Sequence, residues 1–188
     1  MIVSVLLLLV SLGVTAFSLW LHFPQISGAA LAGLAGVFAA LLLAPRKRRQ
    51  ATPRRWVVID GSNVMYWGNS GPDLAVLSAV IGDLQARGLT PAVWFDANVG
   101  YLIGNRYQGP VDMAQRLGLP HRQVFVAPKG TPADPLLLEG AKALNARIVS
   151  NDRYRDWIED HPLAAEPGRL VGGRIGAEGV TFAATRPG

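Results

Sequence analysis

Residues 56–64, Trp-Val-Val-Ile-Asp-Gly-Ser-Asn-Val, form an apolar run that stops at a carboxylate, a glycine and an amide. An unbroken apolar run of this kind predicts a central strand buried on both faces, as in a parallel sheet covered by helices. Asp60 then lies at the C-terminal tip of that strand. In open α/β sheets, ligands bind in the crevice beyond the carboxyl ends of the strands. An Asp-Gly turn without a function is the other interpretation, and this stretch alone leaves both open.

Charge divides the chain of 188 residues into unlike parts. Residues 1–45 contain no Lys, Arg, Asp or Glu. Six basic residues crowd into the next ten positions, namely Arg46, Lys47, Arg48, Arg49, Arg54 and Arg55. Without these six, twelve of the eighteen basic residues remain against thirteen acidic ones, so the net charge of +5 belongs to this junction. It gives no support for a globally basic nucleic-acid-binding surface. Cysteine is absent, which excludes disulfides and thiolate metal sites.

Two uncharged runs precede the basic junction. Residues 1–23 have about the length that a helix needs to cross a bilayer, and residues 27–44 form a slightly shorter run. Because only three residues separate them, the sequence predicts a transmembrane helical hairpin over residues 1–45 and a basic juxtamembrane linker over residues 46–55. A cleaved signal peptide is disfavoured, since the chain start lacks basic residues and its apolar core is long.

The basic residues also predict an orientation for the hairpin. Under the positive-inside rule, the end that follows the second run faces the cytoplasm, so the N-terminus and the soluble domain are both expected on the cytoplasmic side of the cell (inner) membrane. Gly28, Ala32, Gly36 and Ala40 recur every four residues and would let this helix pack closely on the first one, or on another copy in a homo-oligomer. Glycine and alanine are also common in membrane helices generally, and that explanation is equally open.

Residues 56–188 alternate apolar strands with amphipathic helices. Strands are expected to begin at Trp56 and to cover residues 92–95, 123–127, 147–150 and 180–183, with helices over residues 74–88, 111–117, 136–145 and 153–160. This alternation predicts a single α/β domain with a mostly parallel sheet.

Four carboxylates fall at predicted strand ends or a helix start, namely Asp60, Asp134, Asp152 and Asp156. If the first and fourth strands are neighbours at the switch point of a doubly wound sheet, Asp60 and Asp152 lie side by side. The spacing of Asp152 and Asp156 places both on one face of a helical turn. Clustered carboxylates repel unless a cation lies between them, and Mg²⁺ or Mn²⁺ suits an all-oxygen cluster. Such an ion can activate a water for phosphodiester hydrolysis.

Each acid also has an ordinary structural explanation. Asp134 before Pro135 suits an N-cap with proline at the first helical position. Asp152 could cap the helix that it precedes, and Asp156 could pair with Arg153 at little energetic consequence. For each acid alone this explanation is at least as good as the functional one. The functional interpretation rests on all four together, because independent caps need not converge on one edge.

Two motifs of this chain closely resemble those of a known nuclease family. Residues 58–64, VIDGSNV, and residues 148–156, IVSNDRYRD, are similar to the paired motifs of the NYN domains of Zc3h12a-like ribonucleases, within the PIN-like nuclease superfamily. The resemblance implies a PIN-like Rossmannoid three-layer fold and an endoribonuclease that depends on Mg²⁺ or Mn²⁺. By position it assigns the catalytic and metal-binding roles to Asp60, Asp134, Asp152 and Asp156, with Asn63 beside them at the substrate.

The chain departs from that family at two points. Where those relatives often carry two adjacent acids, this chain has Asp134 followed by Pro135, which removes a ligand or water contact. A CCCH zinc finger is absent, since there is no cysteine. Asp96, which ends the second predicted strand, could supply a further acid.

Substrate contacts are expected beside the acidic motif. Arg153 and Arg155 flank Tyr154 and are the preferred phosphate contacts, while Tyr154 could stack on an unpaired base, which favours single-stranded RNA. Further candidates are Arg106 and Lys129 for phosphate and Tyr66 and Trp67 for stacking. A solvated surface explains the arginines equally well, and packing explains Trp67 better.

Three functions are consistent with these patterns. The leading one is a membrane-anchored, metal-dependent endoribonuclease. The second is a catalytically inactive module that binds RNA or a nucleotide, which Pro135 favours. The third is a membrane-anchored scaffold whose aspartates are only caps.

Overall fold

The computed structural model describes residues 13–14, 17–18, 20–22, 54–68 and 70–184. The chain divides into two units, Met1–Ala51 and Thr52–Gly188. The expected transmembrane hairpin and most of the basic linker lie outside the described residues, apart from short helical pieces within residues 13–22. Across the part of the chain that is described, no helix is both long enough and apolar enough to span a bilayer.

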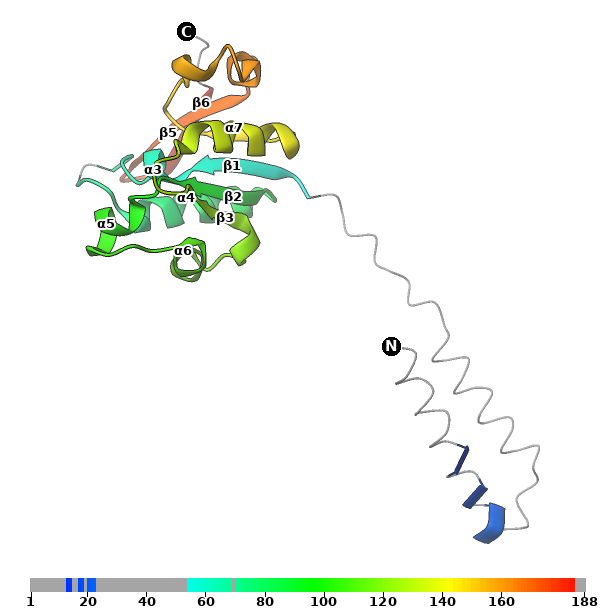
Figure 1. Ribbon diagram of the computed structural model, residues 1–188. Helices are drawn as coiled ribbons and strands as arrows, with labels where there is room; N and C mark the ends of the chain where they lie inside the picture. Colours follow the sequence, from blue (N-terminus) through cyan, green and yellow to red (C-terminus); the bar gives the residue numbers. More distant parts are fainter. Residues whose placement is uncertain (1–12, 15–16, 19, 23–53, 69, 185–188) are drawn as a thin grey trace. The chain divides into compact units, whose positions relative to one another are not determined.

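The second unit alternates strands and helices around one sheet (Figure 1). In chain order the elements are β1 (Trp56–Asp60), α3 (Gly61–Val64), α4 (Leu74–Ala86), β2 (Thr90–Phe95), α5 (Val99–Gly104), α6 (Pro110–Leu117), η1 (His121–Gln123), β3 (Val124–Val126), α7 (Ala133–Ala143), β4 (Arg147–Val149), η2 (Arg155–Trp157), η3 (Pro162–Ala165), β5 (Leu170–Gly176) and β6 (Gly179–Ala184).

The sheet has six strands in the order β3-β2-β1-β4-β5-β6. Every neighbouring pair is parallel except β5 and β6, so the prediction of a mostly parallel α/β sheet is confirmed. β1 lies between β2 and β4, and Ile59 pairs with Val149. The order reverses at β1 and β4, which makes their carboxyl ends the switch point where ligands bind in sheets of this kind.

Side chains of β1 alternate between two apolar cores, one on each face of the sheet. Val57 and Ile59 belong to the core beneath α4 and α6, whereas Val58 belongs to the core beneath α7. Figure 1 shows α7 on one side of β1 and β2, with α4 and α6 on the other. The uninterrupted apolar run of β1 therefore reflects burial on both faces, as a central parallel strand requires.

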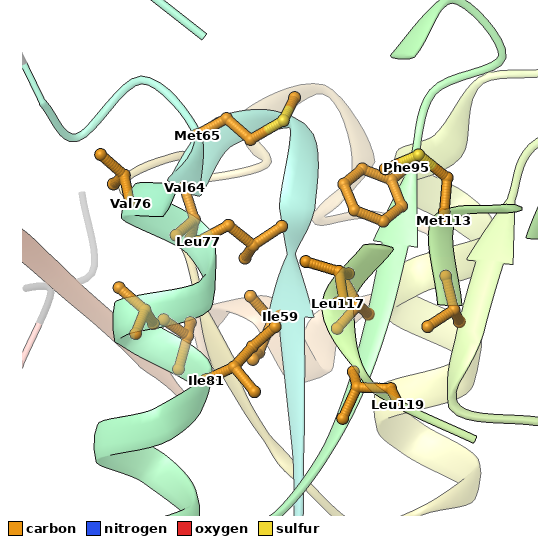
Figure 2. Packing of buried hydrophobic residues seen from close by; sticks show 14 of the residues in the cluster. Ile59, Val64, Met65, Val76, Leu77, Ile81, Phe95, Met113, Leu117 and Leu119 are labelled. Carbon is orange, nitrogen blue, oxygen red and sulfur yellow. The ribbon is translucent and has the colours of Figure 1, made fainter. Parts of the chain in front are cut away.

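The larger core fixes where the carboxyl end of β1 lies. In Figure 2, Leu77 and Ile81 of α4 approach Ile59 from one side, and Phe95 lies on the other. Burying an aliphatic side chain of this size stabilises a fold by about 1.5–3 kcal/mol. Since the residues around Ile59 are fully or almost fully buried, the position of the next residue, Asp60, is set by this packing.

The structure corrects two predicted helices that bear on the site. The helix expected at 136–145 begins at Ala133 instead, and Pro132 is its N-cap residue, so Asp134 lies within the first turn and is not the N-cap. The helix expected at 153–160 is not continuous, because Tyr154 adopts a left-handed backbone with φ of 50° before the short η2 begins. The argument that placed Asp152 and Asp156 on one helical face is therefore wrong.

Candidate active site

Asp60 is a buried carboxylate that accepts hydrogen bonds from three sides. It ends β1 with only 8% of its surface exposed. Its Oδ2 accepts a hydrogen bond from the Ser150 hydroxyl at 2.9 Å and another from the Tyr154 hydroxyl at 2.9 Å. Its Oδ1 accepts the backbone N–H of Asn63 at 3.0 Å, which makes Asp60 the N-cap residue of α3. Asp60 thus joins the ends of two neighbouring strands.

Burial controls the ionisation of this carboxylate. Desolvation raises the pKa of Asp60 from 3.8 to about 6, and the charge of Asp134 adds to the effect. The hydrogen bonds from Asn63, Tyr154 and Ser150 lower the same pKa, because each donor stabilises the charged form. Burial, followed by the nearby Asp60 charge, raises the pKa of Tyr154 well above its usual value, so its hydroxyl stays protonated and donates.

Residue 61 is a glycine because there is no room for a side chain at this position. A Cβ at this position would clash with the ring of Phe95 at the end of β2. The Asp-Gly pair starts α3 directly, and Gly61 is not among the glycines with positive φ. The glycine therefore serves close packing and not a reversed turn, and it lets β1 end within contact of β2.

Asn63 and Asn151 tie the ends of three strands together. The Asn63 amide oxygen accepts the backbone N–H of Asn151 at 3.0 Å and the indole N–H of Trp67 at 3.0 Å. The Asn151 side chain in turn accepts from the Gly173 N–H and donates to the Gly173 carbonyl, each at 2.9 Å. Among the described residues, the Asn63 NH₂ group has no acceptor, so it is left for a ligand at this edge.

A group of acids surrounds Asp134 at the same edge. The pKa of Asp134 is raised, first by partial burial and then by the charges of Asp152, Asp96 and Asp156, while the nearby Trp157 side chain acts in the opposite direction. Asp134 also raises the pKa of Asp60. Asp134 is therefore the acid that feels the charges of Asp152, Asp156 and Asp96 and that in turn acts on Asp60.

The oxygen atoms at this edge are of the kind that hard divalent cations prefer as ligands. The side chains described at this edge offer carboxylate, amide and hydroxyl oxygens as ligands, and Mg²⁺ is commonly held by one or two carboxylates with several waters. Within the described ranges, no three His, Cys, Asp or Glu side chains are close enough together to form a complete site. A cation here would be held by Asp60 and Asp134, and the charges of Asp152 and Asp156 near Asp134 would add to its attraction.

Some expected substrate contacts are exposed and one is not. Arg153 and Arg155 are exposed beside Asp152, as phosphate contacts must be. Tyr154 is only 2% exposed and is packed under α7, so the expectation that it stacks on a base is wrong; its hydroxyl is used by Asp60 instead. Trp67 is a core residue, which confirms packing as its role. The other candidates, Tyr66, Arg106 and Lys129, are exposed.

Sequence reasoning missed Ser150, the residue that joins Asp60 to β4. Ser150 is fully buried, and its Oγ also accepts the backbone N–H of Asp152 at 3.0 Å. Asp152 Oδ1 accepts the Tyr154 N–H at 2.8 Å, which holds the left-handed turn. The sequence did contain a signal, because Ser150 directly follows a buried apolar strand and a buried polar side chain requires a hydrogen-bond partner.

Comparison with known proteins identifies relatives of the second unit. Residues 53–167 match the family model described as the Zc3h12a-like ribonuclease NYN domain. Two solved structures of the nuclear proteinaceous RNase P 2 of Arabidopsis thaliana are similar to this chain. One is 16% identical with a TM-score of 0.51, covering 95% of this chain and 37% of that chain. The other is 17% identical with a TM-score of 0.47, covering 71% and 30%. This chain thus spans little more than a third of that protein at most. No curated protein sequence matches it.

Proposed function

Because the chain belongs to the Zc3h12a-like ribonuclease NYN domain family, we propose that it is a metal-dependent endoribonuclease that cleaves phosphodiester bonds of single-stranded RNA. The reaction would take place at the carboxyl ends of β1 and β4. The observation that carries the proposal is the buried Asp60 carboxylate, held by Ser150 and Tyr154 beside the acids around Asp134.

The proposed roles follow from these contacts. Asp60 and Asp134 hold the cation, which when bound supplies charge neutralisation and lowers the pKa of a water. Ser150 and Tyr154 position Asp60, so the carboxylate that would hold the cation is already ordered before the cation binds. The free NH₂ of Asn63 and the exposed guanidinium groups of Arg153 and Arg155 orient the RNA phosphate by charge-assisted hydrogen bonds.

A cleavage assay with matched variants tests this function. The full chain should cleave an unstructured RNA in Mg²⁺ or Mn²⁺ and lose cleavage in EDTA. Asp134→Asn should lower the rate by about 100-fold or more, since even indirect support of a metal ligand is worth about 10–100-fold. Glu139→Gln makes the same charge change on an exposed position of α7 and should leave the rate unchanged. Equal rates for parent and Asp134→Asn would refute the proposal.

A second candidate function is an inactive module that binds RNA or a nucleotide and does not cleave it. Pro135, which follows Asp134 where relatives of this family often carry a second acid, favours it. The lack of a complete three-acid group among the described residues points the same way. Tight RNA binding without turnover in either metal, with a catalytically competent relative as positive control, would support this alternative.

The proposal includes an anchor and a compartment. The uncharged residues 1–45 would form two membrane helices, and the basic residues 46–55 would keep the nuclease domain at the cytoplasmic face of the cell membrane. An enzyme held there would act on RNA near the membrane. The topology experiment that tests this anchor is described in the Discussion.

A further inference from the structure

A cavity of about 620 Å³ lies at the opposite end of the sheet from the acids. Its walls come from the amino ends of the parallel strands and from the last turns of two helices. The lining residues are Arg54, Arg55, Trp56, Val57, Leu84, Arg87, Leu89, Leu144, Asn145, Arg147, Val149, Val171 and Phe182. This volume falls within the roughly 300–1,000 Å³ of small-molecule sites. The cavity is separate from the proposed catalytic edge, since neither Asp60 nor Asp134 lines it.

Among the described residues, arginine is the only charged residue type that lines this cavity. Arg54, Arg55, Arg87 and Arg147 all contribute to its walls. Arg87 pairs with Asp83 on its own helix, an exposed i,i+4 contact of the kind that contributes little. Within the described ranges, neither Arg54, Arg55 nor Arg147 forms an ion pair. Several like charges around one hollow repel one another, and an anion between them relieves that repulsion.

Aromatic rings hold two of these arginines in place. The Arg54 guanidinium lies 5.7 Å from the centre of the Trp56 ring, and the Arg87 guanidinium lies 5.1 Å from the centre of the Phe182 ring. Phe182 also meets Trp67 edge-on at 6.3 Å. Fixing charged groups before a ligand arrives reduces the side-chain ordering lost on binding. The cavity is therefore partly organised for an anion.

Apart from Asn145, the rest of the lining is apolar or aromatic, which selects among anions. Val57, Leu84 and Val149 are buried, and Leu89, Leu144 and Val171 are partly buried around them. Inorganic phosphate would leave this surface unused. A ligand that carries both a phosphate and a flat ring would contact the arginines with one end and the apolar and aromatic wall with the other.

From this combination we propose that the cavity binds a ribonucleoside monophosphate. Its phosphate contacts Arg147 and the arginines at the start of β1, and its base lies against Trp56 and the apolar wall. The site goes beyond the proposed nuclease function and does not depend on it. β1 and β4 each run from this cavity to the acidic edge, at Trp56–Asp60 and Arg147–Val149, so both sites share the same two strands.

Calorimetric titration of the full chain with the four ribonucleoside 5′-monophosphates tests the site. EDTA is present, so that no cation supports binding at the acidic edge. At least one nucleotide should bind, with its free nucleoside and inorganic phosphate each at least about tenfold weaker, because each loses one half of the contacts. Arg147→Glu should weaken nucleotide binding by about tenfold or more. Arg122→Glu, the same charge change on the exposed η1, should bind like the parent.

Further variants keep the test decisive. Trp56→Leu should weaken nucleotide binding and leave phosphate binding unchanged. If Arg147→Glu does not fold, as judged by its melting curve, Arg147→Gln takes its place. The proposal is overturned if no nucleotide binds, if phosphate alone binds as tightly as the nucleotide, or if Arg147 variants bind like the parent. Binding of anionic phospholipid vesicles that requires Arg147, without nucleotide binding, would assign the cavity to a membrane surface and also overturn it.

Discussion

Asp60 carries a cost in stability that its neighbours only partly offset. A carboxylate removed from water favours its neutral form, and the hydrogen bonds from Asn63, Ser150 and Tyr154 recover part of the lost solvation. A residue that served only as a helix cap would not need to be buried among other acids. The cost is understandable if the charged form is stabilised by a cation during function.

The raised pKa of Asp60 predicts how stability depends on pH. Between about pH 4 and 6 the folded protein holds a proton at Asp60 that the unfolded chain has released, so the free energy of unfolding falls as the pH rises through this window. A shift from 3.8 to about 6 corresponds to about 3 kcal/mol at most. Melting curves of the full chain in EDTA at pH 4, 5, 6 and 7 measure this.

Asp60→Asn is the variant that isolates this effect. It keeps the shape of the side chain and removes the ionisation, so the part of the pH dependence that comes from Asp60 should disappear and the part that comes from the raised pKa of Asp134 should remain. Above pH 6 in EDTA the variant should be at least as stable as the parent, and Mn²⁺ should stabilise only the parent, since an ion that binds the native state raises its stability. An unchanged pH profile in Asp60→Asn would show that other groups are responsible.

The hydroxyl of Tyr154 offers a second test at the level of one residue. Tyr154→Phe removes one donor to Asp60 and leaves the buried ring in place. RNA cleavage and Mn²⁺ affinity should each fall by about 10–100-fold, as is typical when a partner of a metal ligand is lost. Tyr66→Phe removes a hydroxyl from a residue that is 50% exposed and should change neither. Equal metal affinity in both variants would contradict a positioning role for Tyr154.

Between α5 and α6, Gln108 is buried without a partner. It is fully buried, and neither its amide oxygen nor its amide nitrogen has a hydrogen-bond partner among the described residues. Gly100 of α5 packs so closely on this segment that a Cβ there would clash with the Arg106 carbonyl and the Gln108 N–H. The segment is thus held tightly against α5 around a polar side chain.

Gln108→Met should therefore stabilise the protein. Methionine has a similar length and no amide to satisfy, so removing the unpaired groups should raise the free energy of unfolding by about 1–3 kcal/mol. Denaturant unfolding measures the change, and Gln115→Met on the exposed side of α6 is the control that should have little effect. A clear loss of stability in Gln108→Met would mean that the amide has a partner, such as a bound water.

Elements with a strong periodic pattern could be predicted from the sequence, and those defined by tertiary contacts could not. The run 56–60 is unbroken and apolar, α4 is an apolar segment that ends before Gly88, and α6 has a clear helical period and ends at Gly118. β5 was missed because its sequence, LVGGRIG, contains three glycines, and it is a strand through its pairing with β4 and β6 and the Asn151 clamp on Gly173. The short α3 and α5 have too few residues to show a period.

In the candidate site, too, some features could be predicted from the sequence and others depend on tertiary contacts. Strand order predicts that Asp60 lies at the same edge as the acids that follow β4, because it brings carboxyl ends together. The joint metal-binding role of Asp60, Asp134, Asp152 and Asp156 stays a prediction. The left-handed backbone of Tyr154 could not be predicted, since it is held by a local hydrogen bond to Asp152 and by a long-range hydrogen bond to Asp60 at the end of β1. The role of Ser150 depends on the same cross-strand contact with Asp60.

At the scale of the whole second unit, the two candidate sites lie at opposite ends of the sheet. Acids gather beyond the carboxyl ends of the strands, and arginines line the cavity at the amino ends. Arg54 and Arg55, which line that cavity, close the basic stretch that begins at Arg46. The arginine-lined end of the sheet therefore directly follows the proposed membrane anchor in the sequence. The acidic edge lies at the carboxyl ends of the same strands.

The proposed anchor makes a prediction about the full chain in cells. Residues 1–45 carry no charge and residues 46–55 carry six basic side chains, so a reporter fused after Gly188 should be cytoplasmic and the protein should stay in the membrane pellet after alkaline carbonate. The matched variant replaces the basic residues 46–49 with glutamine, which should weaken the cytoplasmic preference of the reporter, since lysine and arginine set orientation. A chain that begins at Thr52 should remain in the supernatant. Release of the full chain by carbonate, or a mature protein that begins after Phe23, would show that residues 1–45 are not a membrane hairpin.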